Sequence, residues 1–240
     1  MHKEKILGLN ILDTTYAELI SNIRADIESS QKRIIVAINP EKIMKVKEDP
    51  FLARFINQAD YLIPDGVGVL MASKKLGGNL KNRITGVDTM VRICKLASVR
   101  GYKVFLLGGK NEVVRAAKDH LEKRFKGIQI VGFKDGYNIN NQELIKKIND
   151  SGAQILFVAM GSPKQENWIQ EHKDQLNVNI FQGVGGSFDV LGQYVKRAPK
   201  WMQDMGIEWM YRLIKNPSRI FRQINLIRFY RLIGKEKKQL

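Results

Sequence analysis

Asp65 is the side chain in this sequence that is best placed to do chemistry. The apolar triplet 61–63 is typical of the end of a buried strand, Pro64 ends that strand, and Asp65 turns the chain together with the glycine that follows it. A carboxylate there would lie at the carboxyl edge of a parallel sheet, where open α/β sheets bind their ligands. It is therefore a candidate general base. The local sequence alone favours a simpler interpretation, a turn-capping aspartate, because Pro-Asp-Gly is a common turn.

Three further polar residues are expected near Asp65. Asn39 follows the β-branched run 33–38 and opens an Asn-Pro-Glu sequence, which is typical of a strand that leads into a helix. Asn39 is therefore predicted to lie on the same sheet edge as Asp65. Arg83 lies in a polar loop and Asp88 in the turn before the next predicted helix, and both residue types bind phosphates or sugars.

Two glycine-rich turns follow predicted strands. Gly108-Gly109 and the segment 183–186, which contains Gly185, would let backbone amides approach a phosphate closely. Neither is a complete dinucleotide-binding fingerprint, since Phe188 occupies the position of the third glycine. Tight turns without a ligand explain these glycines equally well.

A third turn contains the sequence Gly-Ser-Pro-Lys-Gln-Glu. Ser162 is expected to cap the helix 164–172, which would bring Gln165 and Glu166 close to the ligand edge. Gln165 could then pair with a sugar hydroxyl or a base edge, although a well-capped helix start explains the sequence as well. After the last predicted strand, the string 186–202 places charged side chains among apolar ones, and packing alone explains this poorly: Asp189, Lys196, Arg197 and Lys200.

Strand and helix patterns alternate through residues 1–194. Because the strands are nearly continuous apolar runs, they predict an α/β fold with a mostly parallel, doubly wound, Rossmann-like sheet. The predicted strands are 6–13, 33–38, 61–63, 103–107, 128–132, 154–160 and 178–182. The predicted helices are 16–29, one that starts at 40, 87–100, 111–125, 142–149 and 164–172.

Residues 195–240 are predicted to form a separate helical appendage without strands. They hold twelve Lys or Arg and three Asp or Glu, so they contribute +9 of the net charge of +16. Such a tail suggests a polyanionic partner, either nucleic acid or an anionic membrane surface, although a solvated helix face is the simpler alternative. Asn216-Pro217 is expected to start the last helix.

That last helix is amphipathic. Its predicted apolar face contains Ile220, Phe221, Ile224 and Ile227, and Arg219, Arg222 and Arg228 fall beside or opposite that face. With its aromatic residues Phe221, Phe229 and Tyr230, the helix would suit a membrane interface. Packing on the sheet domain or on a partner subunit explains the same pattern equally well.

Composition narrows the remaining classes. The 240 residues are 44% apolar, include one cysteine, Cys94, and contain neither a membrane-spanning apolar run nor an N-terminal signal sequence, so we expect a cytoplasmic location. The three histidines are scattered and no Asp-x-Asp occurs, so we expect neither a metal site nor a cofactor. Phosphate charge would then be neutralised by Arg, Lys and helix N-termini.

Several motifs together resemble the WecG/TagA/CpsF glycosyltransferases from about Gly8 to Tyr230. They are Thr-Gly-Val-Asp (85–88), Leu-Leu-Gly-Gly (106–109), Gly-Ser-Pro-Lys-Gln-Glu (161–166), Gly-Val-Gly-Gly-Ser-Phe-Asp (183–189), Lys-Arg-Ala-Pro (196–199), Gly-Ile-Glu-Trp-Met-Tyr-Arg-Leu (206–213) and Asn-Pro-Ser-Arg (216–219). The resemblance implies transfer of N-acetylmannosamine from UDP to the 4-hydroxyl of undecaprenyl-diphosphate-linked N-acetylglucosamine, with inversion and without metal. This is a step of wall teichoic acid linkage-unit synthesis.

The resemblance also implies roles for single residues. Asp65 would be the base and Arg83 would support catalysis. Asn39, Arg83 and Gln165 would line the pocket, while Arg212, Arg219 and Arg222 would contact diphosphate. From the residues themselves, Asp88, Gly108, Gly109, Gly185 and Asp189 are further candidates for substrate binding. The appendage would dock on the inner face of the cell membrane and close the site. Ala37 departs from the family, which often has a Thr there that is expected to contact substrate, so we expect reduced transfer.

Alternatives remain open from the sequence. A related donor such as the uronic acid of UDP-N-acetylmannosamine would fit, and apolar helix faces leave room for a homo-oligomer. A basic nucleic-acid-binding protein would leave the glycine loops and Asp65 without a purpose, so no nucleic-acid partner is expected. An oxidoreductase is disfavoured by Phe188 in the fingerprint.

Overall fold

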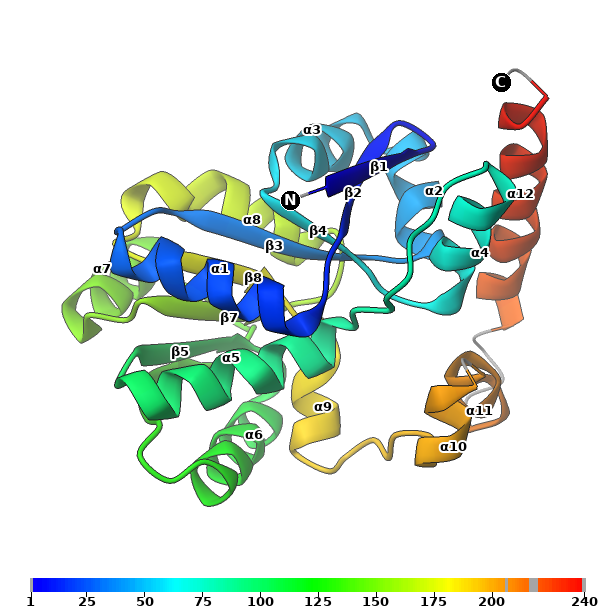
Figure 1. The fold of residues 1–240 in the computed structure, drawn as a ribbon. Helices are drawn as coiled ribbons and strands as arrows, with labels where there is room; N and C mark the ends of the chain where they lie inside the picture. Colours follow the sequence, from blue (N-terminus) through cyan, green and yellow to red (C-terminus); the bar gives the residue numbers. More distant parts are fainter. Residues whose placement is uncertain (1, 206, 216–219, 239–240) are drawn as a thin grey trace.

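The computed structural model describes residues 2–205, 207–215 and 220–238 (Figure 1). Its strands are β1 (His2–Ile6), β2 (Leu9–Asp13), β3 (Arg33–Ile38), β4 (Tyr61–Pro64), β5 (Lys103–Gly108), β6 (Gln129–Lys134), β7 (Ile155–Ala159) and β8 (Ile180–Gly183). Its helices are α1 (Tyr16–Glu28), α2 (Pro40–Glu48), α3 (Pro50–Gln58), α4 (Val67–Lys75), α5 (Gly86–Arg100), α6 (Asn111–Arg124), α7 (Asn141–Ser151), α8 (Lys164–His172), α9 (Ser187–Leu191), α10 (Lys200–Asp204), α11 (Glu208–Lys215) and α12 (Ile220–Glu236), with a 3-10 turn at Lys173–Gln175.

Six of the strands form one sheet in the order β4-β3-β8-β7-β5-β6. Every neighbouring pair in this sheet is parallel. A parallel pair needs a crossover connection, and helices make most of these crossovers, as in other doubly wound α/β folds. The predicted fold class is confirmed, and the carboxyl ends of the six strands meet along one edge of the sheet.

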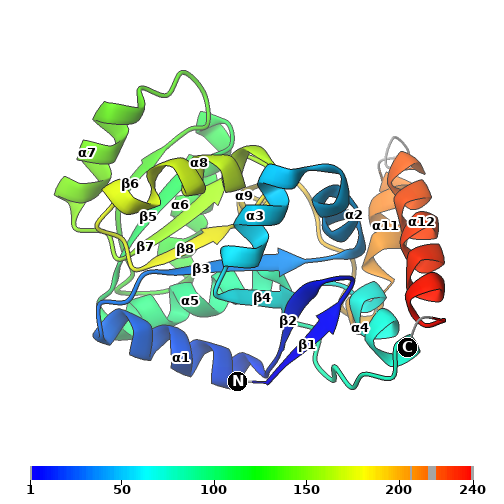
Figure 2. The same ribbon diagram turned by 90° about the horizontal axis from the view of Figure 1, so that it is seen from above.

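Helices cover both faces of the sheet (Figures 1 and 2), so the strand residues alternate between two apolar cores. On β3, Ile34 and Val36 belong to one core and Ile35 belongs to the other. The first core is closed by α2, α3, α4, α7, α8 and α12, and the second by α1, α5, α6 and α9. Burial of each such side chain stabilises the fold by about 1.5–3 kcal/mol, so burial on both faces holds the strand ends firmly in place.

The N-terminal segment differs from its prediction. Residues 6–13 were expected to form one strand, but β1 and β2 form an antiparallel hairpin in which Ile6 pairs with Leu9. Leu7 and Gly8 make the turn with φ angles of 48° and 88°. A two-residue hairpin turn needs positive φ at both positions. Leucine rarely adopts that conformation, and the turn sequence is Leu-Gly and not the usual Asn-Gly. The hairpin was therefore not predicted from the sequence.

The helix α12 packs on the sheet domain along α2 and α4. Phe229 and Ile233 are fully buried in the first core, so the prediction that Phe229 contacts a membrane is wrong. Ile227, predicted on the apolar face, is instead 57% exposed. The predicted helix start at Asn216-Pro217 lies outside the described residues, as do the side chains of Ile220, Phe221 and Ile224. Across the described ranges, no helix combines the length and the apolar character that crossing a membrane requires.

Candidate active site at the carboxyl edge of the sheet

Asp65 lies where β4 ends. Its backbone N–H donates to the carbonyl oxygen of Ile38 at 2.7 Å, which ties it to the end of β3 beside Asn39. Gly66 follows with a φ of 99°, a conformation that side-chain-bearing residues rarely adopt. The Asp65 carboxylate accepts a hydrogen bond from the N–H of Gly86 at 3.3 Å. Asp65 therefore belongs to a turn and also lies at the carboxyl edge of the sheet. Asn39 lies at the same edge, as predicted.

Gln182 holds Gly86 from the other side. Its Nε2 atom donates to the Gly86 carbonyl oxygen at 2.8 Å, and its side chain is fully buried on β8. Its Oε1 atom is buried and has no hydrogen-bond partner among the described residues. A Cβ atom at Gly86 would lie 3.0 Å from the Cβ atom of Ala37, so glycine is what allows this close packing. Sequence reasoning missed Gln182, although a single amide in an otherwise apolar buried strand was a usable signal.

Thr85 and Asp88 form the start of α5. Thr85 accepts from the Asp88 N–H and donates its hydroxyl to the Asp88 carboxylate at 2.7 Å. Its own N–H donates to the hydroxyl of Tyr16 at 2.9 Å. Burial opposes ionisation of Asp88, but hydrogen bonds from Arg197 and Thr85 lower the pKa of its carboxyl below the usual value. Asp88 is therefore a charged group that faces Arg197, as well as the helix-start residue that was predicted.

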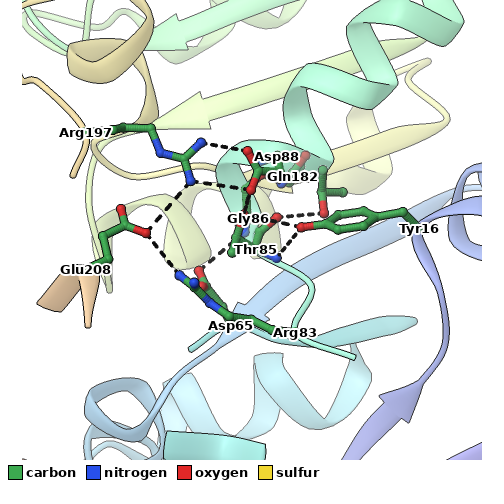
Figure 3. Close-up of polar contacts among 10 residues, drawn as sticks. Tyr16, Asp65, Arg83, Thr85, Gly86, Asp88, Gln182, Arg197 and Glu208 are labelled. Carbon is green, nitrogen blue, oxygen red and sulfur yellow. Dashed lines mark hydrogen bonds and ion pairs between the residues drawn. The ribbon is translucent and has the colours of Figure 1, made fainter. Parts of the chain in front are cut away.

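Two arginines and Glu208 complete this group (Figure 3). Arg197 pairs with Asp88 through two contacts, of 2.7 Å and 3.4 Å. Arg83 donates to the Glu208 carboxylate at 3.1 Å, and the same oxygen lies 3.8 Å from Arg197. Arg83 thus lies at the predicted edge, whereas Glu208 was not predicted at all. We call Asp65, Arg83, Thr85, Gly86, Asp88, Gln182, Arg197 and Glu208 the Asp65 cluster.

A second polar network lies between α2 and α8. Lys42 pairs with Glu166 at 2.7 Å, and the side chains are 11% and 2% exposed. Gln165 donates to the same Glu166 oxygen and accepts from the N–H of Gly185 at 3.0 Å. Burial would raise the pKa of the Glu166 carboxyl, but the Lys42 charge and its hydrogen bond lower it. We call Lys42, Gln165, Glu166 and Gly185 the Glu166 network.

This network shows how Gln165 and Gly185 are held, and it joins the starts of α2 and α8. Gln165 is 2% exposed and makes its hydrogen bonds to protein groups, and the Gly185 amide is used by Gln165. Asn39 accepts from the Lys42 N–H and caps α2 as predicted. The predicted cap at Ser162 is wrong, because α8 begins one residue later with Pro163 at its N-cap position, where no side chain caps the helix.

The Gly108-Gly109 turn is also used internally. A Cβ atom on Gly108 would lie 2.5 Å from the carbonyl oxygen of Ala159, so only glycine fits between β5 and β7. The Gly109 N–H donates to that same oxygen at 2.9 Å. An open depression of about 450 Å³ adjoins the turn and is lined by Lys110, Asn111, Glu112, Lys134, Asp135, Tyr137 and Asn138. The turn therefore lies beside a concave surface at the ligand edge, while its Gly109 amide forms a hydrogen bond to β7.

The remaining predicted residues lie further along the chain. Asp189 lies on α9, and its backbone carbonyl accepts from the Val195 N–H at 3.0 Å. Arg219 lies outside the described residues, and Arg212 and Arg222 lie on helices at positions whose side chains are not among those described. The structure thus brings Asp65, Arg83 and Asp88 together in the Asp65 cluster and places Gln165 and Gly185 in the Glu166 network.

Fold and site together define a doubly wound α/β protein that gathers three carboxylates and two arginines at the ligand edge of its sheet. The chain belongs to the glycosyl transferase WecG/TagA/CpsF family, which matches residues 4–240. It is similar to the N-acetylglucosaminyldiphosphoundecaprenol N-acetyl-beta-D-mannosaminyltransferases of Staphylococcus aureus strains MW2 and NCTC 8325 / PS 47. Each is 35% identical over 240 residues, which covers 99% of this chain and 94% of the relative. The predicted family is confirmed.

Proposed function

We propose that this protein transfers N-acetylmannosamine from UDP to the 4-hydroxyl of N-acetylglucosaminyl-diphosphoundecaprenol. The observation that supports this most directly is the Asp65 carboxylate at the sheet edge, oriented by the Gly86 amide in a chain that belongs to this family. The names of the two relatives supply the sugar and the acceptor. The site supplies a base and cationic groups, which are what a transfer from a nucleotide diphosphate needs.

The proposed reaction is a single displacement. The acceptor hydroxyl oxygen forms a bond to the anomeric carbon while the bond from that carbon to the UDP oxygen breaks. Asp65 takes the hydroxyl proton, and UDP leaves with the bonding electron pair, so the anomeric configuration inverts. Arg83 lies in the same cluster and offsets the negative charge that develops on UDP. Metal independence, and no need for a cofactor, remain predictions of this mechanism.

The decisive experiment replaces Asp65 with Asn and measures transfer to a short-chain lipid-diphosphate-N-acetylglucosamine acceptor. Loss of a general base costs about 10²- to 10⁴-fold in rate, so we expect turnover to fall by that amount while UDP-sugar affinity stays within about twofold. Asp150→Asn, on the exposed side of α7, makes the same chemical change far from the site and should keep full activity. Retained turnover in Asp65→Asn would remove Asp65 as the base.

The donor is assigned by the relatives' names and not by a contact. The uronic acid of UDP-N-acetylmannosamine would add one carboxylate to the donor. A donor screen with the same acceptor tests this directly, and we expect the neutral N-acetylmannosamine donor to give the higher rate. The Asn39, Gln165, Gly108, Gly109, Gly185 and Asp189 positions stay proposed substrate-binding residues, as do Arg212, Arg219 and Arg222.

We further propose that residues 195–240 dock the enzyme on an anionic membrane. The support is a group of apolar side chains exposed on α10, α11 and the turn between them: Trp201 is 58%, Met205 67%, Met210 38% and Ile214 68% exposed. Exposed apolar side chains next to basic ones suit the interface of an anionic bilayer. Because Phe229 and Ile233 are core residues, truncating the chain after Tyr194 would uncover the core and confuse the result.

Point substitutions give a cleaner test of docking. We expect Trp201→Ser with Ile214→Ser to abolish sedimentation with phosphatidylglycerol vesicles while the thermal unfolding midpoint changes little. Val99→Ser, on α5, removes a side chain that is 73% exposed and serves as the matched control. Unchanged sedimentation of the double variant would contradict the docking proposal.

A further inference from the structure

Glu208 connects three separate segments at the edge of the active site (Figure 3). It is the first residue of α11 and only 5% exposed. Its Oε2 atom lies 3.1 Å from a guanidinium nitrogen of Arg83 and 3.8 Å from one of Arg197. One carboxylate oxygen therefore lies between two arginines that come from different loops.

Such a site has the chemistry of an oxyanion-binding site. Guanidinium groups present forked N–H donors that match carboxylate and phosphate oxygens alike. Arg83 and Arg197 both point toward the oxygen of Glu208, and a phosphoryl oxygen at that point would meet the same donors. The Arg197 guanidinium is held in place by its two contacts with Asp88, so its direction does not depend on Glu208 alone.

The charge balance shows why Glu208 matters for a polyanionic ligand. Arg83 and Arg197 are matched by Glu208 and Asp88, and Asp65 adds a further carboxylate nearby. Among the described side chains of this cluster, three carboxylates face two arginines, so Glu208 lowers the positive charge that a diphosphate meets there. When Glu208 moves away, the cluster loses one negative charge, which favours binding of an anion. The guanidinium N–H groups that faced Glu208 then become available to the ligand.

The described side chains of the helix that carries Glu208 are mostly exposed or half-buried. Among the described side chains of α11, Met210, Ile214 and Lys215 are exposed and Tyr211 and Leu213 are half-buried. Among the described side chains of α11, the buried one is the charged Glu208. Its contacts with the two arginines are ones that a phosphoryl oxygen would replace.

We propose that Arg83 and Arg197 form a diphosphate-binding site, which Glu208 occupies in the resting protein and leaves when a diphosphate binds. This rests on the proposed function for the identity of the ligand, because both proposed substrates contain a diphosphate. The site itself is defined by contacts that do not depend on that function.

The test is calorimetric titration of the full-length protein with inorganic pyrophosphate, UDP and a short isoprenyl diphosphate. We expect Glu208→Gln to bind pyrophosphate roughly three- to tenfold more tightly than the wild type, the effect of removing one competing ion pair of modest strength. Arg197→Gln should bind it more weakly than the wild type. Glu143→Gln makes the same charge change on an exposed part of α7 and should leave affinity unchanged.

Unchanged or weaker pyrophosphate binding by Glu208→Gln would overturn the proposal, because Glu208 would then position the arginines without competing for them. Glu208→Asp withdraws the carboxylate by one methylene and provides a milder variant, with a smaller gain expected. On the wild type, hydrogen exchange of amides 208–213 should accelerate when pyrophosphate saturates the protein. Slower exchange there would overturn the proposal without any variant.

The three ligands separate this inference from the proposed function. If UDP binding tightens together with pyrophosphate binding in Glu208→Gln and isoprenyl diphosphate binding does not, the site holds the donor's diphosphate. If isoprenyl diphosphate binding tightens with pyrophosphate binding and UDP binding does not, it holds the acceptor's. If UDP binds the wild type well and no ligand gains affinity in the variant, the transferase proposal stands and the Glu208 inference fails. If pyrophosphate gains affinity but the protein shows no preference for UDP and no transfer, the site stands and the proposed function fails.

Discussion

The Asp65 cluster and the Glu166 network lie on the same sheet edge and use the same kinds of side chain. In the Glu166 network, a lysine and a carboxylate pair at 2.7 Å with exposed fractions of 11% and 2%. In the Asp65 cluster, the Arg83 side chain and that of Arg197 are each 21% exposed, and Glu208 lies at unequal distances from them. The first is a closed ion pair, whereas the second leaves charged groups within reach of solvent.

This difference indicates a structural role for the Glu166 network. The Glu166 network joins α2, α8 and the Gly185 turn, so it fixes the relative positions of three strand ends. The Asp65 cluster contains a carboxylate that accepts from the Gly86 amide, together with Glu208 at the start of α11. Residue type alone therefore does not distinguish the two groups, but the burial of their ion pairs does, and we propose that the chemistry belongs to the Asp65 cluster.

The largest expected effect comes from breaking the closed pair. Lys42→Met leaves the Glu166 carboxylate buried without its cation, and loss of one partner of a buried pair costs about 3–5 kcal/mol of stability. Guanidinium chloride unfolding at neutral pH measures this. The double variant Lys42→Met with Glu166→Met should recover much of the loss, because two apolar side chains need no charge partner.

A surface pair of the same length provides the control. Lys146 and Asp150 are 2.6 Å apart on α7, but their side chains are 76% and 63% exposed. Lys146→Met should cost less than about 1 kcal/mol. Equal losses in the two lysine variants would show that burial does not distinguish the Glu166 network.

The comparison also shows what the sequence could and could not predict. Alternating apolar strands and helices predicted the sheet correctly, because each parallel strand has to be buried on both faces. The proximity of Asn39 and Asp65 followed from that topology. The contact between Arg83 and Glu208 did not, since it joins residues 125 positions apart and no local sequence pattern links that loop to the start of α11.

Helix periodicity did not identify the buried face of α12. The pattern of α12 contains two apolar stripes, and the stripe with Ile227 was taken as the apolar face, whereas the side chains of Phe229 and Ile233 enter the core. One helix turn separates these two residues, so their spacing is as helical as that of the other stripe. Only the packing partners on α2 and α4 decide between the stripes, and those are not visible in the local sequence.

A smaller effect, confined to catalysis, is expected inside the Asp65 cluster. Gln182→Met removes the donor that holds the Gly86 carbonyl, so the Gly86 amide no longer fixes the Asp65 carboxylate. We expect kcat to fall about tenfold with little change in the KM for the donor, since a small misplacement of a catalytic group costs rate more than binding. Steady-state kinetics with both substrates separates the two parameters.

Gln154→Met is the matched control for this substitution. Gln154 accepts from the Lys103 amide at 3.3 Å, at the opposite, amino end of the sheet. Its loss should leave kcat unchanged. A higher KM for the donor with an unchanged kcat in Gln182→Met would show that Gln182 contributes to substrate binding and not to the orientation of Asp65.

The smallest expected effect is a gain at Ala37. Its Cβ atom faces the Gly86 turn, and the buried Oε1 atom of Gln182 in the same group lacks a hydrogen-bond partner within the described part of the chain. A threonine hydroxyl would bring a donor into this space and, by the family pattern, a substrate contact. Ala37→Thr should therefore raise the transfer rate by roughly threefold, corresponding to a hydrogen bond of about 0.5–1.5 kcal/mol. Ala37→Val has the shape of threonine without its hydroxyl, and it should give no gain. An equal gain from valine would assign the effect to packing, and the Asp65 cluster would then work without a polar neighbour at position 37.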